Sequence, residues 1–281
     1  MAYRKIRALP KLPKLEQVDL GVRKELLVGT IFAKDSALQR SWFDLQLRFL
    51  AATTHNYDHV TVLYNETDSD YFSEKSEVFR VNPFTSDDNS KSHLFGLNYL
   101  INIFLSRRHC YKKFLILDSD AFPIRTDWQD LLSKNMQDRL VAIPIRTEDL
   151  ETRIHASIVY LKNEAIDGLE FKIQTSGLDL IGDPECDIVA GKFEEDRHGV
   201  FTMVRSNKYN IHPVLCGVYY DCFYHHCFGS GRKYNIRAKD YWSNICDKDI
   251  NVNSYTNELM SNTNDFIEKL AGWCPERYAK I

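Results

Sequence analysis

The sequence lacks any uninterrupted apolar run as long as the roughly 18 residues needed to cross a bilayer. Its most apolar stretch, Phe95–Leu105, is interrupted by Asn98 and Asn102. The N-terminus (MAYRKIRALPKLPKL) is basic and contains two prolines, but it has no apolar segment of the kind that a secretory signal requires. These absences predict a protein with neither a transmembrane segment nor a secretory signal.

The cysteines of the chain show no spacing that is typical of a metal site or a redox motif. The chain has seven cysteines, an odd number, and none of them belongs to a C-x-x-C motif. Cys216, Cys222 and Cys227 lie near histidines, but the pattern around them indicates a strand rather than the loops of a structural zinc site. We therefore predict reduced thiols, no structural zinc and a cytoplasmic location.

Charge of one sign does not dominate the chain, which carries a net charge of -3 over 281 residues. This balance excludes a protein that coats nucleic acid over its whole surface. Residues 1–24, however, hold seven basic and two acidic side chains, a net of +5 that leaves -8 on the rest. Because Pro10 and Pro13 prevent a continuous helix, we expect residues 1–24 to form an irregular basic arm. Such an arm either binds a polyanion, such as DNA or an anionic membrane, or is only a solubilising end.

Apolar strands alternate with amphipathic helices across residues 25–150. The strand-like run Leu26–Phe32 precedes a helix that has good capping residues at Asp35 and Ser36. This alternation predicts a mostly parallel, Rossmann-like sheet with helices on both faces. Further predicted strands are Val60–Tyr64, Val78–Val81 and Lys113–Leu117, and two helices are indicated by Leu38, Trp42, Leu45 and Phe49 and by Leu94, Leu97, Ile101 and Phe104.

The pattern is less regular in residues 151–281. The chain shows no internal repeat and no linker between its two halves. We therefore predict one α/β domain in two lobes, of which the second has a mixed architecture. Its strand candidates are Ser157–Leu161, Val200–Val204 and Val214–Tyr224, and Asn264–Leu270 is predicted to be a short C-terminal helix.

The most informative segment is FLILDSDAFPI, in which an apolar strand runs into Asp118 and Asp120. In open α/β sheets ligands bind beyond the carboxyl ends of the strands, where these acids lie. Two neighbouring carboxylates repel each other unless a cation lies between them or one is protonated. Their oxygens suit Mg²⁺ or Mn²⁺, ions that commonly share their coordination with substrate phosphates. A surface turn also favours Asp and Ser, but the buried strand before the pair favours a metal site.

A second segment, YHHCFGSGRK, closes an aromatic-rich strand and turns through two glycines into a basic pair. Such a segment can supply an imidazole to a metal, and backbone N–H groups and a guanidinium to a phosphate. Taken alone, it is better explained as a hairpin with a hydrogen-bonded histidine. Its occurrence in the same chain as Asp118 and Asp120 favours the metal and phosphate site.

Together these segments resemble the GT-A glycosyltransferases, in which a DxD motif binds a divalent cation that bridges the two phosphates of a nucleotide-sugar donor. One branch of that family has a late His-x-x-Gly-x-x-Lys motif. His226, Gly229 and Arg232 match its spacing, with Arg in the position of Lys. The resemblance spans roughly residues 25–233 and implies a GT-A fold, with a donor-binding half at 25–150 and an acceptor-binding half at 151–281.

The resemblance also implies roles for individual residues. Either His225 or His226 can complete a metal site with the two aspartates, and the motif spacing favours His226. The implied metal ligands are Asp118, Asp120 and His226, and the implied nucleotide-sugar contacts are Thr30, Phe32, Lys34, His93, Asn98, Asp118, Ser119, Gly229 and Arg232.

A carboxylate base is needed if the reaction inverts the anomeric centre, because the acceptor hydroxyl must then lose its proton during displacement. Asp187 is the first candidate for this base, and Glu195 and Asp196 are the second. The latter two belong to a charge run, which is usually a solvated face. A retaining reaction requires no such base.

The implied function is the transfer of a hexosyl or pentosyl group from a nucleoside-diphosphate sugar to an acceptor hydroxyl, usually on a glycan and with Mn²⁺ or Mg²⁺. The same chemistry on hydroxymethylated phage DNA is an alternative acceptor class. A haloacid-dehalogenase-type hydrolase also has a DxD motif, but it lies near the N-terminus as DxDx followed by Thr or Val. Here the motif lies in mid-chain and its fifth residue is Phe122. A non-catalytic sugar- or nucleotide-binding module accounts for the many aromatic residues but leaves the paired carboxylates and the late histidine unexplained.

Overall fold

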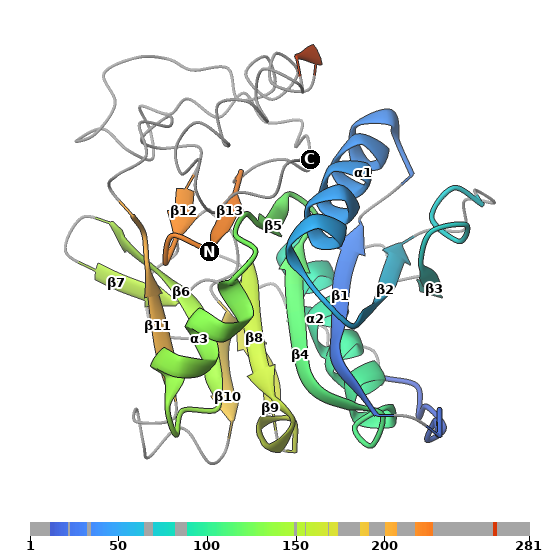
Figure 1. Ribbon diagram of the computed structural model, residues 1–281. Helices are drawn as coiled ribbons and strands as arrows, with labels where there is room; N and C mark the ends of the chain where they lie inside the picture. Colours follow the sequence, from blue (N-terminus) through green and yellow to red (C-terminus); the bar gives the residue numbers. More distant parts are fainter. Residues whose placement is uncertain are drawn as a thin grey trace, which may run out of the picture.

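Figure 1 shows the computed structural model, which describes residues 12–21, 23–32, 35–64, 70–81, 89–148, 151–154, 156–167, 169–173, 186–190, 200–206, 217–226 and 261–262. The main sheet has eight strands, in the order β11-β6-β8-β4-β1-β2-β3 with β7 beside β6. These strands are β1 (Lys24–Phe32), β2 (Tyr57–Tyr64), β3 (Glu77–Val81), β4 (Tyr111–Asp118), β6 (Val141–Glu148), β7 (Glu151–Ile154), β8 (Ile158–Lys162) and β11 (Val200–Val204).

The remaining elements surround this sheet. A three-stranded sheet has the order β12-β13-β5, and a two-stranded sheet pairs β10 with β9. The smaller strands are β5 (Ala121–Pro123), β9 (Leu169–Ile173), β10 (Cys186–Ala190), β12 (Gly217–Tyr219) and β13 (Phe223–His225). The helices are α1 (Ala37–Thr53), α2 (Asn89–Ser106) and α3 (Trp128–Met136), with a short 3-10 turn at Asn163–Ala165.

The first half of the sheet is parallel, as predicted. Strand β1 pairs in parallel with both β2 and β4, and β2 pairs in parallel with β3. The chain therefore builds outward from β1 to β3 and then returns through α2 to place β4 on the other side of β1. Ligands of open α/β sheets bind at such a reversal of strand order, beyond the carboxyl ends of the strands. In this protein the reversal lies between β1 and β4.

Helices cover both faces of the sheet, which confirms the predicted α/β class (Figure 1). Leu26 and Val28 of β1 belong to the same core cluster as Leu50 of α1 and Trp128 of α3. Leu27, between them, packs instead among the apolar residues of α2. Because successive side chains of a strand point to opposite faces, one continuous apolar strand contacts helices on both sides.

Gly29 allows α2 to pack closely on β1. A Cβ atom at position 29 would lie 2.7 Å from Cδ2 of Leu100 and 2.9 Å from Cζ of Phe104. Both distances are shorter than ordinary carbon–carbon contacts, so a larger residue would push the helix away from the strand. The absence of a side chain at this position thus sets the spacing between α2 and β1.

The second half has the predicted mixed architecture. Strand β8 is antiparallel to both β4 and β6, whereas β11 is parallel to β6. The single strand predicted over Val214–Tyr224 is wrong, because β12 and β13 form a hairpin in this stretch. Tyr220 and Asp221, in its turn, have φ values of 53° and 51°. A positive φ is uncommon for a tyrosine, so the residue types gave little sign of the reversal.

The described part of the basic arm is irregular, as predicted, and it packs along α2. Asn102 Nδ2 donates a hydrogen bond to the carbonyl of Pro13 at 2.5 Å, and the Val18 amide donates to the carbonyl of Ser106 at 2.9 Å. Asn102, which interrupts the most apolar run of the sequence, therefore holds the arm in place. Residues 1–11, with four of the seven basic side chains, lie outside the described residues.

Three further predictions concern membrane-spanning helices, the state of the cysteines and the C-terminal helix. Among the helices that the structure describes, none has the length and apolar character needed to cross a membrane. Cys110 and Cys222 are buried free thiols. The predicted C-terminal helix Asn264–Leu270 lies outside the described residues.

Candidate metal-binding site

The DxD segment lies at the carboxyl end of β4, as its sequence predicts. Strand β4 ends at Asp118, and β5 begins just after Asp120. The Asp118 amide donates to the carbonyl of Ser157 at 2.8 Å, and the carbonyl of Asp120 accepts from the His226 amide at 3.1 Å. The turn is therefore held from the β8 side and from the β13 side. Because β4 adjoins β1, it lies at the reversal of strand order where ligands are expected.

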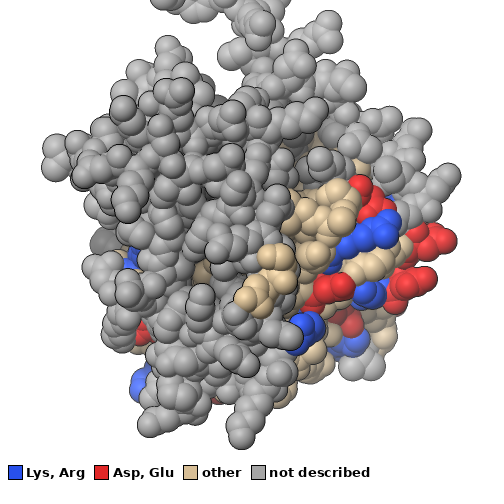
Figure 2. All heavy atoms as spheres, turned by 90° about the horizontal axis from the view of Figure 1, so that it is seen from above, with Lys and Arg blue, Asp and Glu red and all other residues tan. Residues whose placement is uncertain are grey.

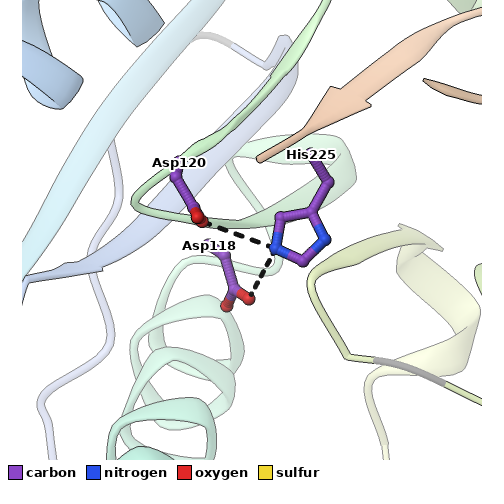
Figure 3. A group of neighbouring side chains, drawn as sticks. All are labelled: Asp118, Asp120 and His225. Atoms are coloured by element: carbon purple, nitrogen blue, oxygen red, sulfur yellow. Dashed lines mark ion pairs between the residues drawn. The ribbon is translucent and has the colours of Figure 1, made fainter. Parts of the chain in front are cut away.

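Two carboxylates and one imidazole meet at this turn (Figure 3). His225 Nε2 lies 3.5 Å from Asp118 Oδ2 and 3.4 Å from Asp120 Oδ1. One ligand atom from each of the three residues lies within 4.8 Å of the other two. The imidazole reaches the aspartates because β13 pairs antiparallel with β5, which places His225 opposite Ala121.

The structure brings His225 to the two aspartates, whereas the motif spacing favours His226. His226 is fully buried, its Nδ1 lies 2.8 Å from the Tyr224 hydroxyl, and its ring lies 4.8 Å from the ring of Trp42. Successive residues of an extended chain point in opposite directions, so only one of two adjacent histidines can face the aspartates. That residue is His225, and His226 packs against α1 instead.

His93 of α2 adds a second imidazole to the group. Its Nε2 lies 3.2 Å from Asp118 Oδ1. The side chains of His93 and Asp118 are 28% and 19% exposed, whereas those of Asp120 and His225 are 6% and 3% exposed. A ligand would therefore approach the group from the side of Asp118 and His93.

The donor set fits a hard divalent cation. Mg²⁺ is usually held by one or two carboxylates together with phosphate oxygens, and Mn²⁺ accepts similar ligands. A neutral imidazole can add a nitrogen ligand through His225 Nε2. Without a cation, the two carboxylates lie close together in a largely buried place, which is unfavourable. Ser119, between them, is also buried.

The described surface above the strand ends carries charges of both signs. Figure 2 shows this face, on which Lys and Arg side chains alternate with Asp and Glu where residues are described. Near α1, Arg40 pairs with Asp35 at 2.5 Å and Lys75 pairs with Asp44 at 2.6 Å. Both of these described cations are therefore already paired with carboxylates.

Two of the predicted nucleotide contacts are core residues. Thr30 has no exposed surface, and its hydroxyl donates to Gln46 Oε1 at 2.9 Å and lies 3.2 Å from His59 Nε2. Phe32 is equally buried, and its ring packs against those of Phe43 and Phe72. The structure therefore does not support a nucleotide contact by either side chain. Both lie on β1, where apolar strand residues are covered from both sides.

The described contacts of Asn98 and the strand pairing of Asp187 both involve β9. Asn98 Nδ2 donates to the Phe171 carbonyl at 2.9 Å, and the Phe171 amide donates to Asn98 Oδ1 at 2.8 Å. Its amide thus holds β9 against α2, which leaves it little capacity for a nucleotide. Asp187 lies in β10, opposite Lys172 of β9. Its role as a base stays a prediction.

The other predicted site residues are not part of the described structure. They are Lys34, Glu195, Asp196, Gly229 and Arg232.

Gln46 of α1 is a residue of this region that the sequence patterns did not reveal. Its side chain is completely buried and belongs to a polar network beneath the DxD turn. From Thr30 the network continues to His59, whose Nδ1 lies 2.9 Å from the Ser76 hydroxyl. The only sign in the sequence is a polar residue between Trp42 and Phe49 on the apolar face of a helix.

The network predicts a specific dependence of stability on pH. Burial lowers the pKa of His59 from 6.5 to about 3. Below pH 6.5 the unfolded chain binds a proton that the folded protein does not, so the free energy of unfolding should fall as the pH drops toward 3. Proton uptake by His59 in the unfolded chain lowers the free energy of unfolding by up to about 1.4 kcal/mol for each unit that the pH falls. Denaturant titrations from pH 7 to pH 4 should show a shallower decline in His59→Gln, and equal slopes would contradict the prediction.

No protein-family model matches the sequence, and a search of curated proteins found no match. A similar solved structure is a Desulfovibrio desulfuricans G20 protein assigned as a nucleotide-diphospho-sugar transferase, with 9% identity, 64% of this chain and 79% of that chain covered, and a TM-score of 0.40. Another is the mannosyltransferase PcManGT from Pyrobaculum calidifontis in complex with GDP-Man and Mn²⁺ (14% identity, 56% of this chain, 50% of that chain, TM-score 0.35). A third is a glycosyltransferase involved in the glycosylation of the major capsid of PBCV-1 (11% identity, 66% of this chain, 84% of that chain, TM-score 0.37). Each of the three is a protein assigned to sugar transfer.

Proposed function

We propose that this chain is a metal-dependent glycosyltransferase that moves a hexosyl or pentosyl group from a nucleoside-diphosphate sugar to a hydroxyl group of a glycan. The observation that carries the proposal is the meeting of Asp118, Asp120 and His225 at the carboxyl end of β4. This group lies where the strand order reverses, next to β1. A cation at this place would neutralise the negative charge of the leaving diphosphate.

The residues of the chain have distinct parts in the proposed reaction. Asp118, Asp120 and His225 would hold Mn²⁺ or Mg²⁺, and the ion supplies charge neutralisation to the leaving diphosphate. His93 Nε2, 3.2 Å from Asp118 Oδ1, orients that carboxylate. Roles proposed from the sequence alone are phosphate binding by Gly229 and Arg232, donor contact by Ser119 and Lys34, and, for an inverting reaction, proton abstraction by Asp187, Glu195 or Asp196.

Calorimetry with nucleotide sugars tests the proposal. UDP-, GDP-, CMP- and TDP-sugars are titrated into the purified protein, with Mn²⁺ and then with EDTA. We expect one nucleotide class to bind only in the presence of Mn²⁺, because its two phosphates complete the coordination of the ion. Slow hydrolysis of the bound donor without an acceptor would then establish catalysis.

The same titrations separate the competing functions. Binding that does not need a metal, or metal-dependent binding without hydrolysis or transfer, would contradict the transferase and favour a binding module. A polyanionic acceptor such as hydroxymethylated DNA predicts an acceptor KM that rises with salt, because salt screens attraction to the basic arm. A neutral glycan, the acceptor proposed here, predicts a flat salt profile.

A further inference from the structure

Gln46 contacts the main chain on both sides of the DxD turn. Its Nε2 donates one hydrogen bond to the carbonyl of Asp118 at 2.9 Å and another to the carbonyl of Ala121 at 2.7 Å. The residues between these two carbonyls are Ser119 and Asp120. A single side-chain amide therefore closes the turn that carries both aspartates.

The orientation of this amide is set by β1. Gln46 Oε1 accepts a hydrogen bond from the Thr30 hydroxyl at 2.9 Å, so its Nε2 must be the atom that faces the turn. Thr30 lies beside Leu117 in the pairing of β1 with β4, one residue before the first aspartate. Both Gln46 and Thr30 have no exposed surface, so water does not compete for these bonds.

The same helix also contacts the segment that carries the metal-binding histidine. Trp42 lies one helical turn before Gln46, and its ring is 4.8 Å from that of His226. His226 in turn donates its amide hydrogen to the carbonyl of Asp120 at 3.1 Å. One face of α1 thus supports the DxD turn directly and the end of β13 through His226.

We propose that Gln46 is a positioning residue, which holds the Asp118 and Asp120 carboxylates at the spacing required by the metal ion. The inference rests on the proposed metal-dependent function and assigns to α1 a part in it. In this role Gln46 acts on the aspartates only through the two main-chain carbonyls that accept from its Nε2. Residues that orient metal ligands in this way commonly change metal affinity about 10- to 100-fold when they are replaced.

The test is Mn²⁺ binding by Gln46→Met, which has similar length and shape but no hydrogen-bond donor. Gln39→Met is the matched control, because Gln39 lies on the same helix and is buried, yet its amide has no hydrogen-bond partner in the described structure. We expect the Mn²⁺ Kd, measured by electron paramagnetic resonance, to rise about 10- to 100-fold in Gln46→Met and to stay unchanged in Gln39→Met. Saturating Mn²⁺ should restore most of kcat.

A merely structural role predicts a different result. Gln46→Met would then have a lowered melting temperature and a wild-type Mn²⁺ Kd, and this outcome would overturn the inference. If Gln46→Met does not fold, Thr30→Val serves in its place. It removes the hydroxyl that orients the amide and that also contacts His59, and it should raise the Mn²⁺ Kd about 5-fold. An unchanged Kd in that variant would also overturn it. Failure of the wild-type protein to bind Mn²⁺ would instead contradict the proposed function itself.

Discussion

Replacing Asp120 by Ala should reduce sugar transfer about 1000-fold or more, to the background level, and should abolish tight Mn²⁺ binding. The carboxylate of Asp120 is one of only two in the described metal group. Its side chain is 6% exposed, so a water molecule would not easily take its place as a metal ligand. Without the cation the diphosphate leaves with uncompensated negative charge. Turnover of a nucleotide sugar, followed with and without added Mn²⁺, measures the effect.

The fold should survive this substitution. The main-chain carbonyl of Asp120 accepts from the His226 amide at the end of β13, and this hydrogen bond does not depend on the carboxylate. The melting temperature in EDTA should therefore stay near that of the wild type. Asp130→Ala, at an exposed aspartate in the first turn of α3, is the matched control and should keep full activity. Full activity of Asp120→Ala in EDTA would exclude the metal-dependent mechanism.

The two adjacent histidines should differ in their effect on metal binding. His225→Ala removes the imidazole whose Nε2 faces both carboxylates, so we expect the Mn²⁺ Kd to rise about 100-fold. His226→Ala removes a fully buried ring that packs on Trp42 and pairs with the Tyr224 hydroxyl. Its free energy of unfolding should fall by about 2–4 kcal/mol, because a cavity and an unpaired hydroxyl remain.

Mn²⁺ titrations and urea denaturation of both variants check this pair of expectations. The comparison is internally controlled, because the two substitutions are identical in chemistry and adjacent in sequence. A larger loss of metal affinity in His226→Ala than in His225→Ala would restore the ligand assignment that the motif spacing favours.

The sequence by itself determined several of the local elements and the main acidic motif. Strand β1 lies where the run Leu26–Phe32 predicts it, and Val200–Val204 is matched residue for residue by β11. These predictions hold because a buried strand needs a continuous apolar run, and a helix between two such strands needs one apolar face. The place of Asp118 and Asp120 follows from the same rule, since they directly succeed the last apolar residue of β4.

Only the tertiary structure decided which side chains complete the site and which support it. His225 and His226 have the same chemistry and adjacent positions, and the pairing of β13 with β5 alone determines which imidazole faces the aspartates. Gln46 gave no motif, because its partners are main-chain carbonyls, which every residue possesses. Thr30 lies near the end of β1 and was therefore a predicted nucleotide contact, yet the side chain of Gln46 from α1 covers it. Such contacts depend on the direction of each side chain in the folded chain, which residue type and spacing do not specify.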